Sequence, residues 1–318
     1  MKRTPIAALL SLLALAFPTS SFAGKQAGGI IIGGEPNFST YVVPELQTMR
    51  ADVVKFHLSY DGNWSGGYPS TFAVPASYLN SAISAGARDL IVRTQETKLG
   101  VSELNHFMAG MRFSDTGERL IDYIYNHRAQ VHVWVEVGNE PDNHGADPYV
   151  QRYWLIQIAN QVAPQYTYLF NLHWIASLPA AASGSYVDIF YSTASDGNVQ
   201  SKYESLGAHE YANQNFSYAV INRALSVLPA GHTIWVTEAG INDNVDWGTK
   251  GSRYKTAVQR YAADGRIRGW TFFLLSQTLY WNYCVNSDGS CLRYGIDLYY
   301  NSTTQVPGRP CAAQLSTR

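Results

Sequence analysis

One short run of residues, 131–137, limits what this chain can fold into more than any other. Valines alternate there with larger side chains, which is typical of a β-strand with one apolar face. Gly138 and Pro141 end the strand, and Asn139 and Glu140 lie between them. In parallel α/β proteins, an amide and a carboxylate at the carboxyl end of a strand are typical of a catalytic site. A polar loop that leads into a helix is the alternative.

A second predicted strand, 233–237, ends in the same way, because Glu238 follows it directly. Strand-like runs recur along the chain with helix-like stretches between them, which predicts a parallel sheet. The predicted strands are 29–33, 53–58, 89–94, 131–137, 168–174, 205–209, 233–237 and 269–275. This alternation, in a chain of about 295 residues after its leader, predicts an α/β fold in the form of a single (β/α)8 TIM barrel.

The alternation within each strand also predicts which side chains point into the barrel. Outward side chains pack on helices and should be apolar, while inward ones can be polar near the catalytic end. The polar residues predicted to point inward are Lys55, His57, Asp89, Arg93 and Glu136. Glu140 continues the alternation of Glu136, and Glu238 continues that of Ile234 and Val236. Inward charges of both signs can neutralise one another, which buried ions require.

The first 23 residues have the pattern of a secretory signal peptide. Lys2 and Arg3 precede an apolar run, 6–17, and small residues lead to a predicted cleavage after Ala23. Residues 24–318 then form the mature domain, which we expect in a secreted or periplasmic location. The apolar run is too short to span a membrane, so we expect no membrane insertion. A net charge of -1 lacks the basic footprint of a nucleic-acid-binding protein.

Three cysteines follow residue 283. Cys284 and Cys291 flank a turn-like segment, and in an oxidising compartment we expect this pair to form a disulfide. A bridge from Cys311 to either of them is the alternative. Neither the spacing nor the neighbouring histidines match a zinc site. The sequence therefore implies no metal and no organic cofactor.

Two glutamates at strand ends are suited to the cleavage of a glycosidic bond. One carboxyl protonates the leaving oxygen, while the other attacks the anomeric carbon or activates water. The acid needs surroundings that raise its pKa, and the other carboxylate must stay ionised beside hydrogen-bond donors. We assign this pair to Glu140 and Glu238. Asn139 is suited to donate a hydrogen bond to a sugar hydroxyl at the same site.

Short motifs make the chain resemble the clan A glycoside hydrolases, a group of retaining TIM-barrel glycosidases. In that group the fourth strand ends in Asn-Glu-Pro, as residues 139–141 do, and the seventh ends in a glutamate, as Glu238 does here. The resemblance implies that Glu140 is the acid/base and Glu238 the nucleophile. It also implies that Asn139 binds the sugar 2-hydroxyl.

The resemblance extends to residues that support the pair. The sixth strand of the clan often ends in His-x-Tyr, which matches His209 and Tyr211. The tyrosine usually hydrogen-bonds the nucleophile and keeps it ionised, and a basic residue from an early strand often does the same. His57 and Arg93 are our candidates for that basic residue. The alternative is that both histidines are core residues bonded to backbone, and that Arg93 is a structural ion-pair partner.

Aromatic side chains are predicted to complete the sugar site. The clan usually ends its eighth strand in a tryptophan that forms the floor of the site, but Trp270 lies at the start of that run, so Trp281 is expected to replace it. Trp174, at the predicted end of the fifth strand, is a further candidate for sugar contact, with packing as the alternative. Other aromatic residues expected in the loops around the site are Trp64, Tyr68, Trp247, Tyr280 and Tyr283.

Together these features predict a secreted retaining glycosidase that cleaves β-linked polysaccharide by endo action, with Glu140 and Glu238 as its pair. The expected partner is a poly- or oligosaccharide substrate, and we expect a monomer. Retention predicts carboxyl groups about 5 Å apart, whereas a separation of about 9 Å would contradict it. A glucan transglycosylase with the same pair and a non-catalytic carbohydrate-binding barrel are the alternatives.

Overall fold

The structure is a computed structural model that describes residues 26–31, 38–58, 69–94, 100–193, 195, 197–212, 215–241 and 247–272. Within these residues the strands pair in chain order as a closed parallel barrel, in which β1 contacts both β2 and β8. The strands are β1 (Gln26–Ile31), β2 (Val53–His57), β3 (Asp89–Arg93), β4 (His132–Val137), β5 (Leu172–Ser177), β6 (Ser205–Ala212), β7 (Thr233–Ile241) and β8 (Ile267–Phe272). The prediction of an α/β barrel is confirmed.

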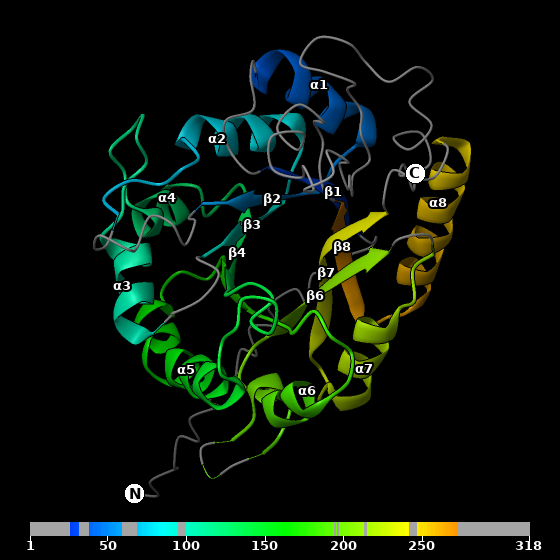
Figure 1. The fold of residues 1–318 in the computed structure, drawn as a ribbon. Coiled ribbons are helices and arrows are strands. Elements are labelled where there is room, and N and C mark those ends of the chain that lie inside the picture. The colour runs from blue at the N-terminus through cyan, green and yellow to red at the C-terminus, as the bar shows by residue number, and fades with distance from the viewer. Residues whose placement is uncertain are drawn as a thin grey trace, which may run out of the picture.

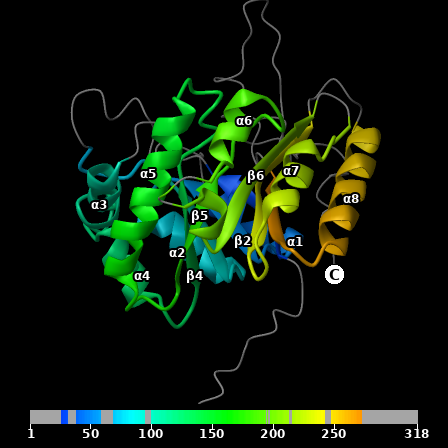
Figure 2. The ribbon, with the colours of Figure 1, turned by 90° about the horizontal axis from the view of Figure 1, so that it is seen from below.

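Helices surround the barrel, as the two ribbon views show (Figures 1 and 2). They are α1 (Phe38–Met49), α2 (Ala76–Ala85), α3 (Val101–Ala109), α4 (Leu120–Asn126), α5 (Pro148–Gln161), α6 (Ser185–Phe190), α7 (Ala219–Val227) and α8 (Trp247–Ala263), with short 3-10 helices η2 (Ala163–Tyr166) and η3 (Val199–Ser201). Local sequence sets several of their ends. The Asp147 side chain accepts two backbone N–H groups at the start of α5, and Gly86 ends α2 in the left-handed conformation.

The alternation of the strands divides the apolar core into two parts. Outward side chains, such as Val54 and Val135, pack in a large buried cluster that joins the strands to the helices. Inside the barrel a separate cluster consists of Val53, Ile91, Trp134, Ile175 and Trp235, which we call the inner apolar layer. Because Val53 precedes Lys55 on β2 and Trp134 precedes Glu136 on β4, this layer fills the barrel on the amino-terminal side of Lys55 and Glu136.

β5 lies later in the chain than predicted, at Leu172–Ser177 instead of 168–174. The residues before it turn rather than extend, and the buried Asn171 side chain donates to two backbone carbonyls near the end of α4 and the start of β4. Trp174 is therefore in mid-strand, where it belongs to the helix-facing core and its ring centroid is 6.5 Å from that of Tyr166. The prediction that Trp174 contacts sugar is wrong, because its side chain packs between the barrel and the surrounding helices.

An irregularity in β7 decides where Glu238 points. Ile234 and Val236 point outward into the helix-facing core, so simple alternation would turn Glu238 outward as well. The pairing with β6 shifts at this point, because Ala208 pairs with Val236 but His209 pairs with Glu238. A β-bulge of this kind inserts one residue and reverses the alternation beyond it. Glu238 consequently points into the barrel.

Several predictions concern residues outside the described part of the chain. These are the signal peptide, all three cysteines, Trp281, Trp64, Tyr68, Tyr280 and Tyr283. Among the helices that the structure does describe, none combines the length and the apolar character needed to cross a membrane.

Candidate active site

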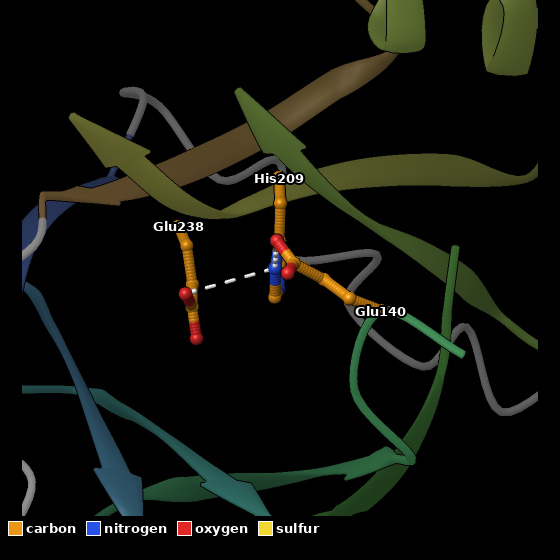
Figure 3. A group of neighbouring side chains, drawn as sticks. All are labelled: Glu140, His209 and Glu238. Atoms are coloured by element: carbon orange, nitrogen blue, oxygen red, sulfur yellow. Dashed lines mark hydrogen bonds and ion pairs between the residues drawn. The ribbon is translucent and has the colours of Figure 1, made fainter. Parts of the chain in front are cut away.

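Two glutamates and a histidine meet inside the barrel at the carboxyl ends of its strands (Figure 3). Glu140 lies just after β4, His209 in β6 and Glu238 in β7. Nδ1 of His209 is 2.8 Å from Oε1 of Glu140 and 3.6 Å from Oε2 of Glu238. One carboxylate oxygen of each glutamate and one ring nitrogen of the histidine all lie within 4.8 Å of one another. The two carboxylates are therefore close enough to act on opposite sides of one bond.

Hydrogen bonds and ion pairs hold both oxygens of Glu238. Oε1 accepts from Nζ of Lys55 at 2.9 Å and from Nε2 of His57 at 3.1 Å, and Oε2 accepts from the Tyr211 hydroxyl at 2.5 Å. Only 6% of the side chain is exposed, so these donors take the place of water around its charge. Burial acts to raise the pKa of Glu238, but the positive charges of His209 and Lys55 hold it well below its ordinary value. Glu238 is therefore ionised at neutral pH, as a nucleophile must be.

A fully buried carboxylate, that of Glu136 in β4, shares the same cation. It lies 2.5 Å from Nζ of Lys55 and accepts a hydrogen bond from the Thr237 hydroxyl at 2.5 Å. Burial acts to raise the pKa of Glu136, yet Lys55 and His209 lower it to about 2. Gly207 leaves room for this carboxylate, because a Cβ at that position would lie 2.5 Å from its Oε1. Lys55 thus connects Glu136 to the candidate nucleophile.

Glu140 lies in a tight turn that fixes its side chain. Gly138 has φ 85° and Glu140 has φ 37°, a left-handed conformation that costs a non-glycine residue energy and is frequent at functional sites. Oε1 of Glu140 accepts from His209, and Oε2 accepts from Nδ2 of Asn143 at 2.9 Å. The carboxylate of Asp142 fastens the same turn by accepting two backbone N–H groups beyond β5, at 2.8 and 2.9 Å.

The ionisation of Glu140 differs from the prediction for a glycosidase acid. Burial acts to raise its pKa, but the hydrogen bond and charge of His209 hold the pKa below the ordinary value. Burial acts to lower the pKa of His209, whereas the negative charge of Glu238, the nearby carboxylate of Glu136 and the hydrogen bond to Glu140 raise it to about 9. At neutral pH the proton between them therefore lies on His209. The expectation that Glu140 has a raised pKa is wrong for the protein without substrate.

The remaining predicted site residues lie around this centre. All five polar residues predicted to point into the barrel are buried. The pKa of His57 is lowered to about 3 by burial and by the charge of Arg93, so a neutral ring donates to Glu238 through Nε2. Arg93 itself is 2% exposed at the end of β3. Asn139 is also buried, with Nδ2 3.5 Å from Nε2 of His144, and its Oδ1 accepts no hydrogen bond from the described residues.

Two contacts of the glutamates are not among the site residues predicted from sequence. Alternation predicts that Lys55 points inward, but not that it pairs with both Glu136 and Glu238, because that depends on the bulge in β7. Asn143 follows Glu140 by three residues, and its amide reaches back to that carboxylate only because of the turn between them. The three-residue spacing alone does not indicate this contact.

The same three side chains, Glu140, His209 and Glu238, are also the group among the described residues that could offer ligands to a metal ion. Their other contacts do not favour this use. Nδ1 of His209 lies at donor distance from Glu140, and Lys55 already neutralises Glu238. A metal ligand needs a free imidazole lone pair, which a protonated ring lacks. The residues therefore fit a hydrogen-bonded acid–base cluster better than a metal centre.

Solved structures with the same fold are glycoside hydrolases. One is a family 39 glycoside hydrolase from Bacteroides cellulosilyticus WH2, with 12% identity and a TM-score of 0.58 over 92% of this chain and 63% of that one. A subgroup II family 128 endo-β-1,3-glucanase from Sorangium cellulosum shares 12% identity with a TM-score of 0.50 over 92% and 98%. A family 30 endoxylanase from Clostridium papyrosolvens C71 shares 12% identity with a TM-score of 0.50 over 92% and 70%.

At identities of this size the structural likeness shows the fold alone, which this chain shares with glycoside hydrolases of families 39, 128 and 30. The comparisons thus support the resemblance that the three motifs indicate. No protein-family model matches the sequence, and no curated protein matches it either. The residues of the site therefore carry the functional argument.

Proposed function

We propose that this protein is a retaining glycoside hydrolase of clan A, a secreted single-domain (β/α)8 barrel that cleaves β-linked polysaccharide by endo action. The observation that carries the proposal is the pair Glu140 and Glu238, whose oxygens come within 4.8 Å of each other but whose surroundings differ. Retaining glycosidases need carboxyl groups about 5 to 5.5 Å apart, whereas inverting enzymes need a wider gap for water. The spacing supports double displacement.

In the first step Glu238 attacks the anomeric carbon, while Glu140 protonates the leaving oxygen. Lys55, His57 and Tyr211 contact the Glu238 carboxylate and hold it ionised and in place. Preorganised donors of this kind cost no rearrangement at the moment of reaction. The product of the step is an ester between the sugar and Glu238, with the leaving group released as an alcohol.

In the second step Glu140, now ionised, takes a proton from water as the water attacks the ester. His209 and Asn143 hold the Glu140 carboxylate from opposite oxygens, so its position is fixed in both steps. Asn139 is suited to bind the sugar 2-hydroxyl, because it is buried beside Glu140 and its Oδ1, which accepts no hydrogen bond from the described residues, can accept one from that hydroxyl. Each step uses only groups of this chain and water.

The substrate class can be narrowed by a direct assay. Two structures that share the fold are described as an endo-β-1,3-glucanase and an endoxylanase, so β-1,3-glucan and xylan come first in a panel of β-linked polysaccharides. Release of reducing ends should accompany a fall in viscosity, since endo action shortens the polymer early. Release of short products without a fall in viscosity would contradict endo action.

The roles of the two glutamates can be separated by azide rescue. In Glu238→Ala, azide can enter the space of the nucleophile and should give a glycosyl azide of inverted configuration from an activated aryl oligosaccharide. In Glu140→Ala, azide should replace water in the second step and give the retained configuration. NMR of the product anomers distinguishes the two. Identical products from both variants, or full activity in either without azide, would contradict the assignment.

A further inference from the structure

His209 is a buried ionisable group at the site that the reaction just described leaves without a chemical step. It is 3% exposed, and charged groups from several elements face it. Its Nδ1 is 2.8 Å from Glu140 and 3.6 Å from Glu238, and its Nε2 is 3.6 Å from Oε1 of Glu136. Lys55 from β2 shares this cluster, and the Tyr211 ring lies next along β6 at 6.4 Å between centroids.

The charges in this cluster require a proton on the ring. Three carboxylates surround His209, and Lys55 pairs with two of them, Glu136 and Glu238. Buried carboxylates are stable only when positive charge or hydrogen-bond donors compensate them. Both oxygens of Glu140 face nitrogen atoms, those of His209 and Asn143, at hydrogen-bond distance. The acid of the proposed reaction is thus ionised in the substrate-free protein, while its neighbour has the raised pKa of about 9.

We propose that His209 holds the catalytic proton between turnovers and passes it to Glu140 across their hydrogen bond when substrate binds. The inference rests on the proposed function, because it supplies the proton that the first step consumes. In the transfer the Nδ1–H bond breaks and an O–H bond forms on Oε1 of Glu140. The ring keeps its other proton on Nε2, which faces Glu136. The water that enters in the second step returns a proton to Glu140 and from there to His209.

His209 acts through Glu140 and is therefore a positioning residue, not a catalytic one. One shared proton gives the pair a common titration, so the alkaline limb of the pH–rate profile belongs to both residues together. If the ring is replaced by glutamine, the hydrogen-bond donor remains but the stored proton is lost. The alkaline limb should then reflect Glu140 alone and move to lower pH by several units, from about 9 toward the ordinary range of a glutamate.

Nitrogen-15 NMR of the histidine side chains can locate the proton without any substrate. His209, assigned by comparison with His209→Gln, should be doubly protonated at pH 7 and should titrate above pH 8 in the wild-type protein. In Glu140→Gln its titration midpoint should fall, since one of its negative neighbours is gone. A neutral His209 ring at pH 7 in the wild-type protein would overturn the proposal.

The pH dependence of kcat/KM then tests the transfer. His209→Gln should show the alkaline limb displaced to lower pH, with activity retained on the acid side. Tyr211→Phe is the matched control, since it lies on the same strand and contacts Glu238, and it should lower the rate without displacing the limb. An unchanged limb in His209→Gln would overturn the transfer. If the wild-type protein cleaves no substrate at any pH, the proposed function fails and the transfer with it, while the NMR result still decides where the proton lies.

Discussion

The two ends of the barrel interior are filled by side chains of opposite character, apolar at one end and charged at the other. On the amino-terminal side, the inner apolar layer packs large side chains against each other, with the Trp134 and Trp235 rings 5.5 Å apart. On the carboxyl-terminal side, the strands carry ions: Lys55 on β2, Glu136 on β4, His209 on β6 and Glu238 on β7. On β2 and on β4, only two positions along the strand separate the apolar residue from the charged one.

The difference indicates that the apolar end contributes mainly to stability and the charged end mainly to function. Apolar layers stabilise a fold and tolerate changes of similar volume. A buried ion cluster gains less, because desolvation costs each ion several kcal/mol, and well-packed apolar groups of similar volume are often as stable or more so. A charged layer directly above an apolar one is therefore better explained by the proposed reaction than by the stability it adds.

The largest expected effect comes from replacing one charged side chain, Lys55, by an apolar one. Lys55→Met should lower kcat/KM by at least about a thousandfold, because it removes the cation that holds the nucleophile ionised. It should also lower the free energy of unfolding by about 3 to 5 kcal/mol, since two buried carboxylates lose their partner. Kinetics and urea unfolding measure the two effects.

Val53→Ala is the matched control for Lys55→Met, since it lies two residues earlier on the same strand in the inner apolar layer. It should cost about 1 to 3 kcal/mol of unfolding free energy through lost packing, and it should leave kcat/KM within about twofold. Near-normal activity in Lys55→Met would contradict the view that the charged end serves the proposed reaction.

Acid should weaken the charged end before the apolar one. The pKa of His57 is lowered from 6.5 to about 3, so its neutral form stabilises the fold fully above about pH 6.5 and this contribution is lost as pH falls toward 3. Glu136 and Glu238 have lowered pKa values too, so their contributions are present above about pH 4.5 and are lost below it. The raised pKa of His209 acts in the opposite sense, with its contribution fully present below about pH 6.5 and lost as pH rises through about 9.

Urea unfolding between pH 6.5 and pH 4 should therefore show a free energy that falls with acid by a few kcal/mol. His57→Gln should flatten the part of this slope nearest to pH 6. Trp134→Phe, at the apolar end, should lower the whole curve without changing its slope. A slope unaffected by His57→Gln would mean that other groups dominate the acid response.

Much of the fold follows from the sequence because period-two alternation and intervening helices are local signals. The strands around Val53, Asp89 and His132 were predicted to within a residue at their start, and their polar side chains point inward as alternation requires. The predicted fifth strand, 168–174, begins too early, because it includes Tyr168 and Phe170. Both are more than half exposed, outside the core that a barrel strand packs against.

The parts of the site that sequence could not predict depend on local departures from regular geometry. Glu238 points inward only because of the bulge in β7, and Glu140 reaches Asn143 only through its left-handed turn. The lowered pKa of Glu140 is likewise a property of the assembled cluster, because His209 comes from a strand 69 positions away. Motifs identify which residues meet, but not which of them holds the proton.

A moderate effect is expected from Trp134→Phe at the apolar end. The indole N–H donates to Asp89 at 2.5 Å, and the ring stacks on His173 at 4.3 Å and beneath Arg268 at 4.5 Å. Loss of the hydrogen bond and of part of the ring should cost about 2 kcal/mol of unfolding free energy. Catalysis and its pH profile should not change. A displaced pH profile of kcat/KM in Trp134→Phe would show that the two ends are coupled. The apolar end would then influence catalysis as well as stability.

The smallest expected effect concerns Asn143, which lies outside both layers but contacts the acid directly. Its amide donates to Oε2 of Glu140 at 2.9 Å at an exposed position, so Asn143→Ala should change the free energy of unfolding by less than about 0.5 kcal/mol. Loss of this contact should lower kcat by about tenfold, because one hydrogen bond to a charged group is worth about 1.5 kcal/mol when it fixes a reacting carboxylate. Asn143→Asp keeps the shape but places a negative charge beside Glu140, which should raise the pKa of Glu140 and displace the pH–rate profile to higher pH. Equal kinetics in the wild-type protein and both variants would show that His209 alone positions the acid. The loop that carries Asn143 would then contribute nothing to the position of Glu140.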